Sequence, residues 1–312
     1  MILDVMGISR QEGLSAIGYH EENSDDLEEL ADRQSYLVVS NVPGNYFAVP
    51  LGIVRRIEQV NASRIEDKVG RPGLQYEDRS LPLISLSQLP EVPKEDGETQ
   101  FVLVFRTQGH EIGLVVNDLM DAHEASTIVD DKTFAQKGIM GSIIIEGHTV
   151  LLVDLYELAK QRYPEWTDTT QMKKSEGDAP VSVLVVDDSS FYRNQISRFV
   201  SELGAEVVTA EDGEIGLQKL QSQENKFDIV LTDIEMPNLD GLGFMRAIRG
   251  DPNLQSLPVI AITSLAGTDN EEMVMQAGAD KYMVKLAKDE LQSTLVQLSS
   301  KLKRKAVSKE EG

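Results

Sequence analysis

Short apolar runs, separated by glycine, proline, asparagine and aspartate, fill the chain between about Ser35 and Leu158. Each run is only a few residues long and has the character of a β-strand. Many short strands at regular spacing favour small barrels over a sheet crossed by helices. This interpretation rests on the runs at residues 36–39, 46–49, 81–84, 101–105 and 112–116.

The pattern changes at Val181, where apolar runs begin to alternate with segments that repeat apolar residues at helical spacing. Such alternation predicts an α/β unit in which a five-stranded parallel sheet is doubly wound by helices. The strands are expected at residues 183–186, 206–209, 229–232, 259–262 and 281–284, and the helices at 191–203, 213–220, 242–248 and 286–302.

The β-rich region contains an internal repeat. Residues 44–49 match residues 109–114, and each segment follows an apolar strand. Residues 81–86 match residues 150–155 in the same way. Two similar small barrels in tandem account for this repeat.

The ends and the middle of the chain suggest domain boundaries. Residues 2–5 resemble residues 152–155, the last predicted strand of the repeat, and a polar stretch without apolar periodicity separates the two regions. The predicted division is residues 1–9 as the last strand of a truncated preceding barrel, 10–32 as a polar connector, 33–162 as the two-barrel domain, 163–180 as a linker, 181–303 as the α/β domain and 304–312 as a tail.

Composition and charge exclude several classes of function. The chain has 312 residues, of which 41% are hydrophobic and 26% charged, as in globular proteins of two or three domains. The net charge of −22 argues against binding to nucleic acid, which needs clustered Lys and Arg. The absence of cysteine excludes a disulfide framework and a thiolate metal site. Because no signal peptide or membrane-length apolar run is present, we expect a cytoplasmic protein without direct membrane insertion.

Side chains suited to metal and phosphate chemistry stand at the ends of four predicted strands. Asp187 and Asp188 follow the first strand, Asp233 follows the third, and Thr263 and Lys285 follow the fourth and fifth. Ligands of open parallel sheets bind outside the carboxyl ends of the strands, so we expect these five side chains on one edge. Magnesium takes oxygen ligands, a carboxylate can attack phosphorus in line, and an ammonium and a hydroxyl can bind phosphoryl oxygens. The sequence therefore predicts a magnesium-dependent phosphoacceptor site.

This pattern resembles the receiver domain of two-component response regulators, which implies a flavodoxin-like fold over about residues 181–302. The acidic pair, the nucleophile, a Met-Pro-x-x-Asp-Gly turn at residues 236–241, the threonine and the lysine all occur in the family order. The resemblance implies that Asp233 is the phosphoacceptor and that Tyr282 is the switch aromatic, whose ring reorients on phosphorylation. Leu286 stands where the family usually has proline, often after a cis bond. A cis bond before a non-proline residue costs about 2.5–4 kcal/mol, so a trans or strained loop is expected.

The same resemblance implies a cofactor, Mg²⁺, and its ligands. Magnesium keeps several waters, so a few protein oxygens are enough to hold it. The implied ligands are the side chains of Asp188 and Asp233, a water-mediated contact of Asp187 and the backbone carbonyl of Glu235.

The β-rich region resembles CheW-like coupling domains, and in particular the regulatory domain of the chemotaxis kinase CheA. The resemblance is carried by residues 46–51, 81–84, 113–119 and 138–141. It implies two small barrels that dock kinases, receptors and other CheW-like domains and that have no catalytic residues. Many coupling proteins have an Arg-Gly pair a few residues before the Leu-Pro strand, where this chain has Glu77 and Asp78.

The order of the two regions resembles the CheV family of chemotaxis adaptors. It implies a phosphoprotein that receives a phosphoryl group from a CheA-type histidine kinase and is not itself an enzyme, since no glycine-rich ATP lid or kinase box occurs in the sequence. An alternative is the C-terminal part of a hybrid CheA-type histidine kinase. The strand-like residues 2–5 favour this alternative. A DNA-binding regulator is disfavoured by the charge and by the lack of an output domain.

Overall fold

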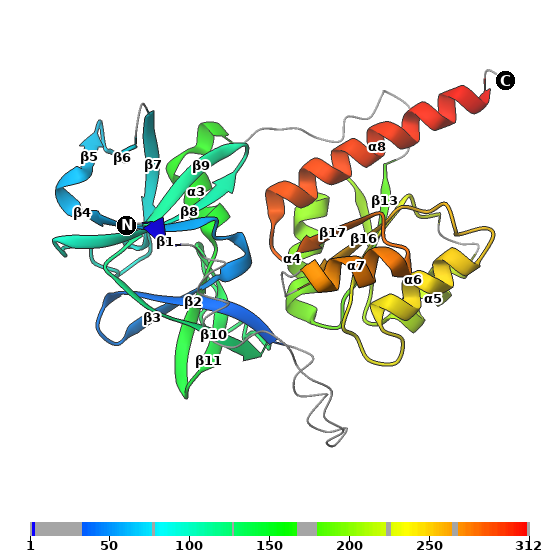
Figure 1. Ribbon diagram of the computed structural model, residues 1–312, viewed down its shortest axis with the longest axis horizontal. Coiled ribbons are helices and arrows are strands. Elements are labelled where there is room, and N and C mark those ends of the chain that lie inside the picture. The colour runs from blue at the N-terminus through cyan, green and yellow to red at the C-terminus, as the bar shows by residue number, and fades with distance from the viewer. Residues whose placement is uncertain are drawn as a thin grey trace. The chain divides into compact units, whose positions relative to one another are not determined.

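The computed structural model describes residues 2–3, 33–76, 79–126, 128–166, 180–222, 226–263 and 268–310 (Figure 1). The chain divides into two compact units, Met1–Asp168 and Thr169–Gly312. The predicted connector at residues 10–32 and most of the predicted linker at 163–180 lie outside the described residues. None of the helices within the described ranges is long and apolar enough to cross a membrane.

The first unit is built from β-strands, with one α-helix, α3 (Leu155–Arg162), and four short 3-10 helices among its described residues. The 3-10 helices are η1 (Leu51–Ile53), η2 (Ala62–Arg64), η3 (Leu86–Gln88) and η4 (Pro164–Trp166). The strands are β1 (Ile2–Leu3), β2 (Arg33–Val42), β3 (Asn45–Pro50), β4 (Arg56–Asn61), β5 (Ile65–Lys68), β6 (Arg71–Tyr76), β7 (Arg79–Ser85), β8 (Thr99–Thr107), β9 (His110–Val116), β10 (Asp118–Ser126), β11 (Ile139–Ile145) and β12 (His148–Val153).

The strands of this unit form two sheets in the part of the chain that is described. The first has the order β1-β4-β8-β9-β7-β6-β5, and the second has the order β10-β2-β3-β12-β11. In each sheet a hairpin, β8–β9 or β2–β3, is extended by a parallel strand, β7 or β12. The segments matched by the sequence repeat therefore occupy equivalent places, which confirms the predicted pair of similar β units. Each sheet takes its hairpin from one repeat and its other strands from the other, so the two units are interleaved.

Both sheets curl toward closure. In the first sheet, β5 follows β4 after only the three residues of η2, yet it pairs at the opposite end of the sheet beside β6. In the second sheet, Asp130, just beyond β10, forms a β-bridge with Ser142 of β11 at the far edge. A sheet whose ends are joined in this way forms a small barrel filled by side chains.

Alternation along the strands divides the apolar side chains between two cores. On β8, Leu103 and Phe105 belong to a core shared by both sheets and helix α3, whereas Val102 and Val104 face the interior of the first barrel. The shared core ties the two interleaved barrels into one folding unit.

The strand predicted at the start of the chain is present as β1. It pairs antiparallel with β4, and Ile2 lies opposite Glu58 while Leu3 lies opposite Ile57. β1 thus extends the first sheet of this same unit. Residues 4–9 lie outside the described residues, and a further barrel before them stays a prediction.

The second unit is a parallel five-stranded sheet with the order β14-β13-β15-β16-β17. Its strands are β13 (Ser182–Val186), β14 (Glu206–Ala210), β15 (Ile229–Asp233), β16 (Val259–Thr263) and β17 (Lys281–Val284). Numbered along the unit, this order is 2-1-3-4-5, the flavodoxin-like arrangement that the sequence predicts.

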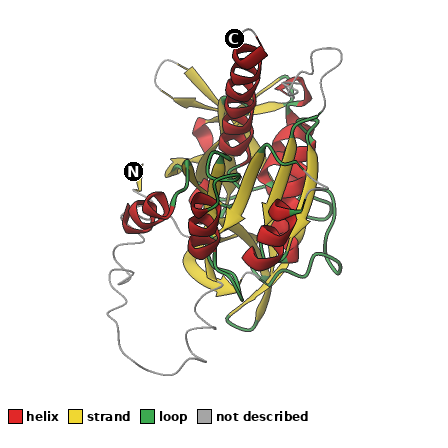
Figure 2. Cartoon of the chain, turned by 90° about the vertical axis from the view of Figure 1, so that its right-hand side faces the viewer, coloured by secondary structure: helices red, strands yellow, loops and turns green. Residues whose placement is uncertain are grey.

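Helices cover this sheet in two groups (Figure 2, helices red and strands yellow). They are α4 (Ser190–Ser201), α5 (Gly213–Gln221), α6 (Gly241–Gly250), α7 (Thr268–Ala277) and α8 (Lys288–Glu310). Helix α4 contacts α8, whereas α6 contacts both α5 and α7, as expected for helices on the two faces of a doubly wound sheet. The sequence interpretation missed α7, because its segment is mostly polar and buries little beyond Val274 and Ala277.

Candidate functional site

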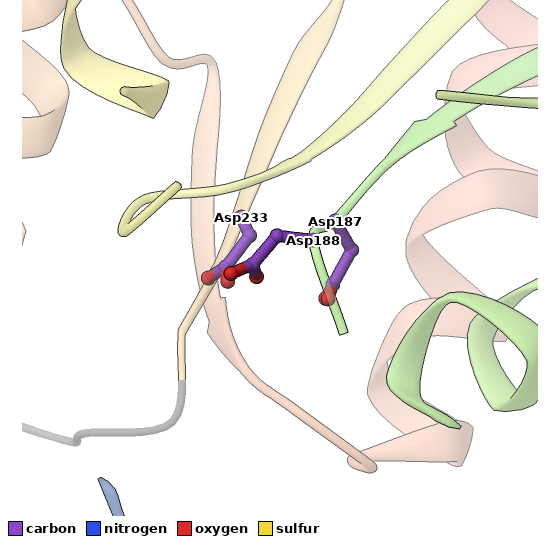
Figure 3. Close-up of side chains that lie close together, drawn as sticks. All are labelled: Asp187, Asp188 and Asp233. Atoms are coloured by element: carbon purple, nitrogen blue, oxygen red, sulfur yellow. The ribbon is translucent and has the colours of Figure 1, made fainter. Parts of the chain in front are cut away.

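Three aspartates meet at the carboxyl ends of the two central strands of the parallel sheet. Asp187 and Asp188 directly follow β13, and Asp233 is the last residue of β15. The two strands pair with Val186 opposite Thr232, so the register places the first pair of acids beside Asp233. One carboxylate oxygen from each aspartate lies within 4.8 Å of the others, and Figure 3 shows the three side chains gathered there.

Lys285 completes this cluster from the edge of the sheet. Its Nζ atom lies 2.7 Å from Asp233 Oδ2 and 3.1 Å from Asp187 Oδ2, and its side chain is 1% exposed. Its backbone N–H donates to the carbonyl of Thr263 at 2.7 Å, which joins the ends of β17 and β16. The five side chains predicted from the strand ends therefore lie on one edge of the sheet.

Two further predicted residues, Glu235 and Tyr282, belong to the same domain. Glu235 is exposed in the loop two residues after Asp233. Tyr282 is half-buried on β17 and packs against the hydrophobic core of this unit. Their assignments as a carbonyl ligand and as the switch aromatic stay predictions.

Backbone groups hold one oxygen of each aspartate in place. The N–H of Ser189 donates to Oδ1 of both Asp187 and Asp188 at 2.9 Å, and the N–H of Ile234 donates to Asp233 Oδ1 at 2.8 Å. The guanidinium of Arg193 donates to the carbonyls of Asp187 and Asp188 and so fixes the loop after β13. The carboxylates are thus oriented by the local backbone, independently of any ligand.

Burial shapes the protonation of the cluster. Burial raises the pKa of Asp187 to about 7, with a further rise from the charge of Asp233, although Lys285 opposes both effects. Burial lowers the pKa of Lys285, but the charges of Asp233 and Asp187 outweigh it and raise that pKa above its ordinary value. The ammonium therefore stays charged at neutral pH, whereas Asp187 is close to its midpoint.

The donor set fits a hard divalent cation. Asp187 Oδ2 is buried and lies in ion-pair range of Lys285, but within the described structure it has no hydrogen bond of acceptable geometry. Such orphaned buried oxygens are rare and mark places where an ion or water belongs. Three carboxylates against one ammonium also leave excess negative charge, and an all-oxygen set suits Mg²⁺.

Tyr192 takes part in this site, although the sequence interpretation did not single it out. Its fully buried ring lies with its centroid 4.5 Å from Lys285 Nζ, a cation–π contact. The residue follows Phe191 in the first turn of α4, and the two rings pack edge to face. An apolar pattern cannot distinguish a ring that packs on a cation from one that only fills the core.

Leu286 adopts an unusual backbone conformation. No cis peptide bond occurs among the described residues, and Leu286 has a φ of +64° with its side chain 3% exposed. A left-handed conformation costs an L-residue roughly 1–2 kcal/mol, so this position is strained through its φ angle and not through a cis bond. The hydrogen bond from Lys288 N–H to the Leu286 carbonyl at 2.8 Å holds the turn that positions Lys285.

The turn after β15 brings a glycine against the main chain of Asp233. A Cβ atom at Gly241 would lie 2.1 Å from the Asp233 carbonyl oxygen and 2.7 Å from Ile234 Cα. The Gly241 N–H donates to the Ile234 carbonyl at 2.8 Å, and Asp240 caps α6 through the Gly243 N–H. Only glycine fits there, which explains the Asp-Gly pair of the predicted turn.

Comparison with known families agrees with both units. Residues 183–296 match the family described as response regulator receiver domain, and residues 36–162 match the CheW-like domain. The chain contains a CheW-like domain followed by a receiver domain.

Individual relatives align with most of the chain. The sensor histidine kinase CheAY of Helicobacter pylori is 29% identical over 288 residues, which cover 88% of this chain and 35% of the kinase. The chain thus spans about a third of the length of that relative. Chemotaxis protein CheV3 of the same organism is 26% identical over 229 residues, which cover 66% of this chain and 72% of that protein.

Solved structures also resemble the receiver domain. One is the receiver domain of a sensor histidine kinase from Pseudomonas aeruginosa, which is 29% identical, with a TM-score of 0.36. The match covers 39% of this chain and 99% of that structure, in which a magnesium ion is coordinated in the active site cleft.

Replacing Asp187 with Asn should stabilise the metal-free receiver domain at pH 8 and stabilise it less at pH 5. The raised pKa of Asp187 means that the folded state loses stability as pH rises from about 4 to about 7, because it must then bury a charged carboxylate. At pH 8 we expect at least about tenfold greater hydrogen-exchange protection of β13 and β15 in a chelator, because each unit by which the pKa is raised corresponds to a factor of ten in the folding equilibrium. Weaker protection of the variant at pH 8 would contradict this account of the buried charge.

Replacing Gly241 with Ala should destabilise the receiver domain by about 1–3 kcal/mol, because the added methyl group must displace the Asp233 main chain. Gly250→Ala in the same helix is the matched control, since a Cβ there meets nothing within 4 Å. We expect the control to be neutral or stabilising. Hydrogen exchange of β15 in both variants measures the difference, and equal behaviour would exclude the close approach as the reason for glycine.

Proposed function

We propose that this chain is a chemotaxis signalling adaptor whose receiver domain accepts a phosphoryl group on Asp233 from a histidine kinase. The arrangement of Asp233 carries the proposal. One of its oxygens is held by a backbone N–H, and the other faces a buried ammonium beside two more carboxylates. A pre-oriented carboxylate next to a cation and a metal-binding donor set can act as a nucleophile toward phosphorus.

The proposed step is an in-line displacement. A carboxylate oxygen of Asp233 forms a bond to phosphorus, and the bond from phosphorus to the donor nitrogen of a phosphohistidine breaks. The electron pair leaves with that nitrogen, and because the other ring nitrogen carries a proton, the imidazole is released in its neutral form. Lys285 then moves its ion pair from the carboxylates to a phosphoryl oxygen, and the Thr263 hydroxyl donates to another.

Magnesium fits this proposal as the cofactor. Asp187, Asp188, Asp233 and the backbone carbonyl of Glu235 would hold it, in agreement with the donor set described above. The bound ion would neutralise charge on the phosphoryl group as the carboxylate approaches. Asp187 must be deprotonated to contribute fully, so its pKa of about 7 favours binding above neutral pH.

Phosphorylation would be read out through β16 and β17. The backbone link between Lys285 and Thr263 couples the two strand ends, and Ala261 of β16 lies opposite Tyr282 of β17. A shift of Thr263 toward the phosphoryl group would therefore act on the strand that carries Tyr282. A two-state surface of this kind alters which partner the domain binds.

The CheW-like domain supplies the docking role in this proposal. Its partners would be a CheA-type kinase, chemoreceptors or other CheW-like domains, and CheV3 is a chemotaxis protein that aligns along most of its length. A second candidate is the C-terminal portion of a hybrid CheA-type kinase, favoured by the alignment of 88% of this chain with CheAY. The mass of the native protein in its source cells distinguishes the two candidates, because a hybrid kinase is far longer.

Incubation with radiolabelled acetyl phosphate and Mg²⁺ should label the protein on Asp233, and hydroxylamine should release the label as expected for an acyl phosphate. Asp233→Asn should abolish labelling, because it replaces the nucleophilic oxygen. Glu272→Gln, an exposed acid in the same domain, is the matched control and should be labelled normally. Labelling of Asp233→Asn to the wild-type level, or none of the wild type, would refute the proposal.

A further inference from the structure

The first barrel of the CheW-like domain has a cavity of about 490 Å³ whose lining is strongly basic. The charged groups that line it are Arg55, Arg56, Arg79, Arg106, His110 and Glu111. Four of the chain's 14 arginines thus converge on one cavity of a protein with a net charge of −22. The lining contains no lysine among the described residues.

Strand register shows that this cavity is the open end of the barrel. Arg56 lies opposite Val104, which faces the barrel core, and cross-strand partners point to the same face. Arg106 is two residues beyond Val104 on the same strand and lies opposite Glu111, so both also face inward. The charged side chains stand where the apolar layers of the barrel stop, and barrel mouths are common ligand sites.

The positive charge of the cavity exceeds what its own acids neutralise. Arg56 binds Glu58 at 2.8 Å and Glu111 at 3.1 Å. In the described part of the chain, Arg55, Arg79 and Arg106 form no ion pair. Burial raises the pKa of Glu111, but Arg56, followed by the charges of Arg55 and Arg79, outweighs it and lowers that pKa. A carboxylate inside the cavity is therefore stabilised by several guanidinium groups at once.

The chemistry of the lining selects the class of ligand. A guanidinium is planar and can donate two parallel hydrogen bonds to the two oxygens of a carboxylate or phosphate. Several guanidinium groups around one cavity therefore suit a ligand with several negative charges. Leu81 and Pro82 add an apolar wall, and a volume of about 490 Å³ is that of a small-molecule site.

We propose that the mouth of the first barrel binds a small multivalent oxyanion, a polyphosphate or a polycarboxylate. The site belongs to the CheW-like domain and is separate from the chemistry of Asp233. It would make the docking domain responsive to an anionic metabolite in addition to the phosphorylation of the receiver domain.

The only tryptophan of the chain provides a reporter for this site. The Trp166 ring stacks on His110 at 4.6 Å, and His110 lines the cavity. Titration of the full chain with pyrophosphate or with citrate, at fixed ionic strength and with a chelator to remove metal, should change the tryptophan fluorescence in a saturable way. Stronger binding of pyrophosphate identifies a polyphosphate site, and stronger binding of citrate identifies a polycarboxylate site.

Variants test whether the arginines hold the anion. Arg79→Gln/Arg106→Gln should weaken binding at least about tenfold, because it removes two charge-assisted contacts. Arg64→Gln, which removes the same charge from the same barrel outside the cavity, should bind like the wild type. Arg79→Lys/Arg106→Lys should bind with intermediate affinity, because lysine keeps the positive charge but cannot donate two parallel hydrogen bonds to one oxyanion.

Two results would overturn the proposal. One is that neither anion binds, and the other is that the double Gln variant binds as tightly as the Arg64→Gln control. Both replaced arginines are exposed, so the fold should persist, and labelling of Asp233 in the double variant provides an independent check. That labelling should be unchanged, which separates failure of this site from failure of the phosphoacceptor.

Discussion

The receiver domain is organised around a buried cation. The ammonium of Lys285 is almost fully removed from water and is held between Asp187 and Asp233 with the ring of Tyr192 beside it. Removing such a group from water costs several kcal/mol, which only close and well-oriented counter-charges can offset. Several contacts orient these counter-charges. The backbone N–H groups of Ser189 and Ile234 hold the carboxylates, and Arg193 holds the loop after β13. A backbone hydrogen bond to Thr263 holds Lys285. The strained backbone at Leu286 is tolerated because it completes the same arrangement.

The same cluster carries more negative than positive charge. Three carboxylates face one ammonium, and the buried oxygen Asp187 Oδ2 has no hydrogen bond in the described structure. The pKa of Asp187 is raised to about 7, which is close to neutral pH. A divalent cation would relieve the excess negative charge, and a phosphoryl group would then give Lys285 a new partner. The excess of negative charge among the three carboxylates is what would couple metal binding, phosphorylation and the position of β16 and β17.

The CheW-like domain satisfies a different constraint, the closure of two short sheets that exchange strands. Each barrel depends on a hairpin from the other repeat, and a shared core joins them, so neither is expected to fold without its partner. Interleaving also places residues from four strands around one barrel mouth. The arginines there concentrate positive charge in a chain that is otherwise strongly acidic.

The sequence by itself determined the strand ends that carry Asp187, Asp233, Thr263 and Lys285, because apolar runs and their spacing define a parallel sheet whose carboxyl ends share one edge. It also determined the pair of β units through the internal repeat. Only the tertiary structure decided the contact of Tyr192 with Lys285, the left-handed backbone of Leu286 and the near-neutral pKa of Asp187, since each depends on burial by distant segments. Helix α7 was missed because its segment is mostly polar and lacks a clear apolar face. Arg56 and Arg106 are 50 positions apart, and strand pairing alone brings them to one cavity.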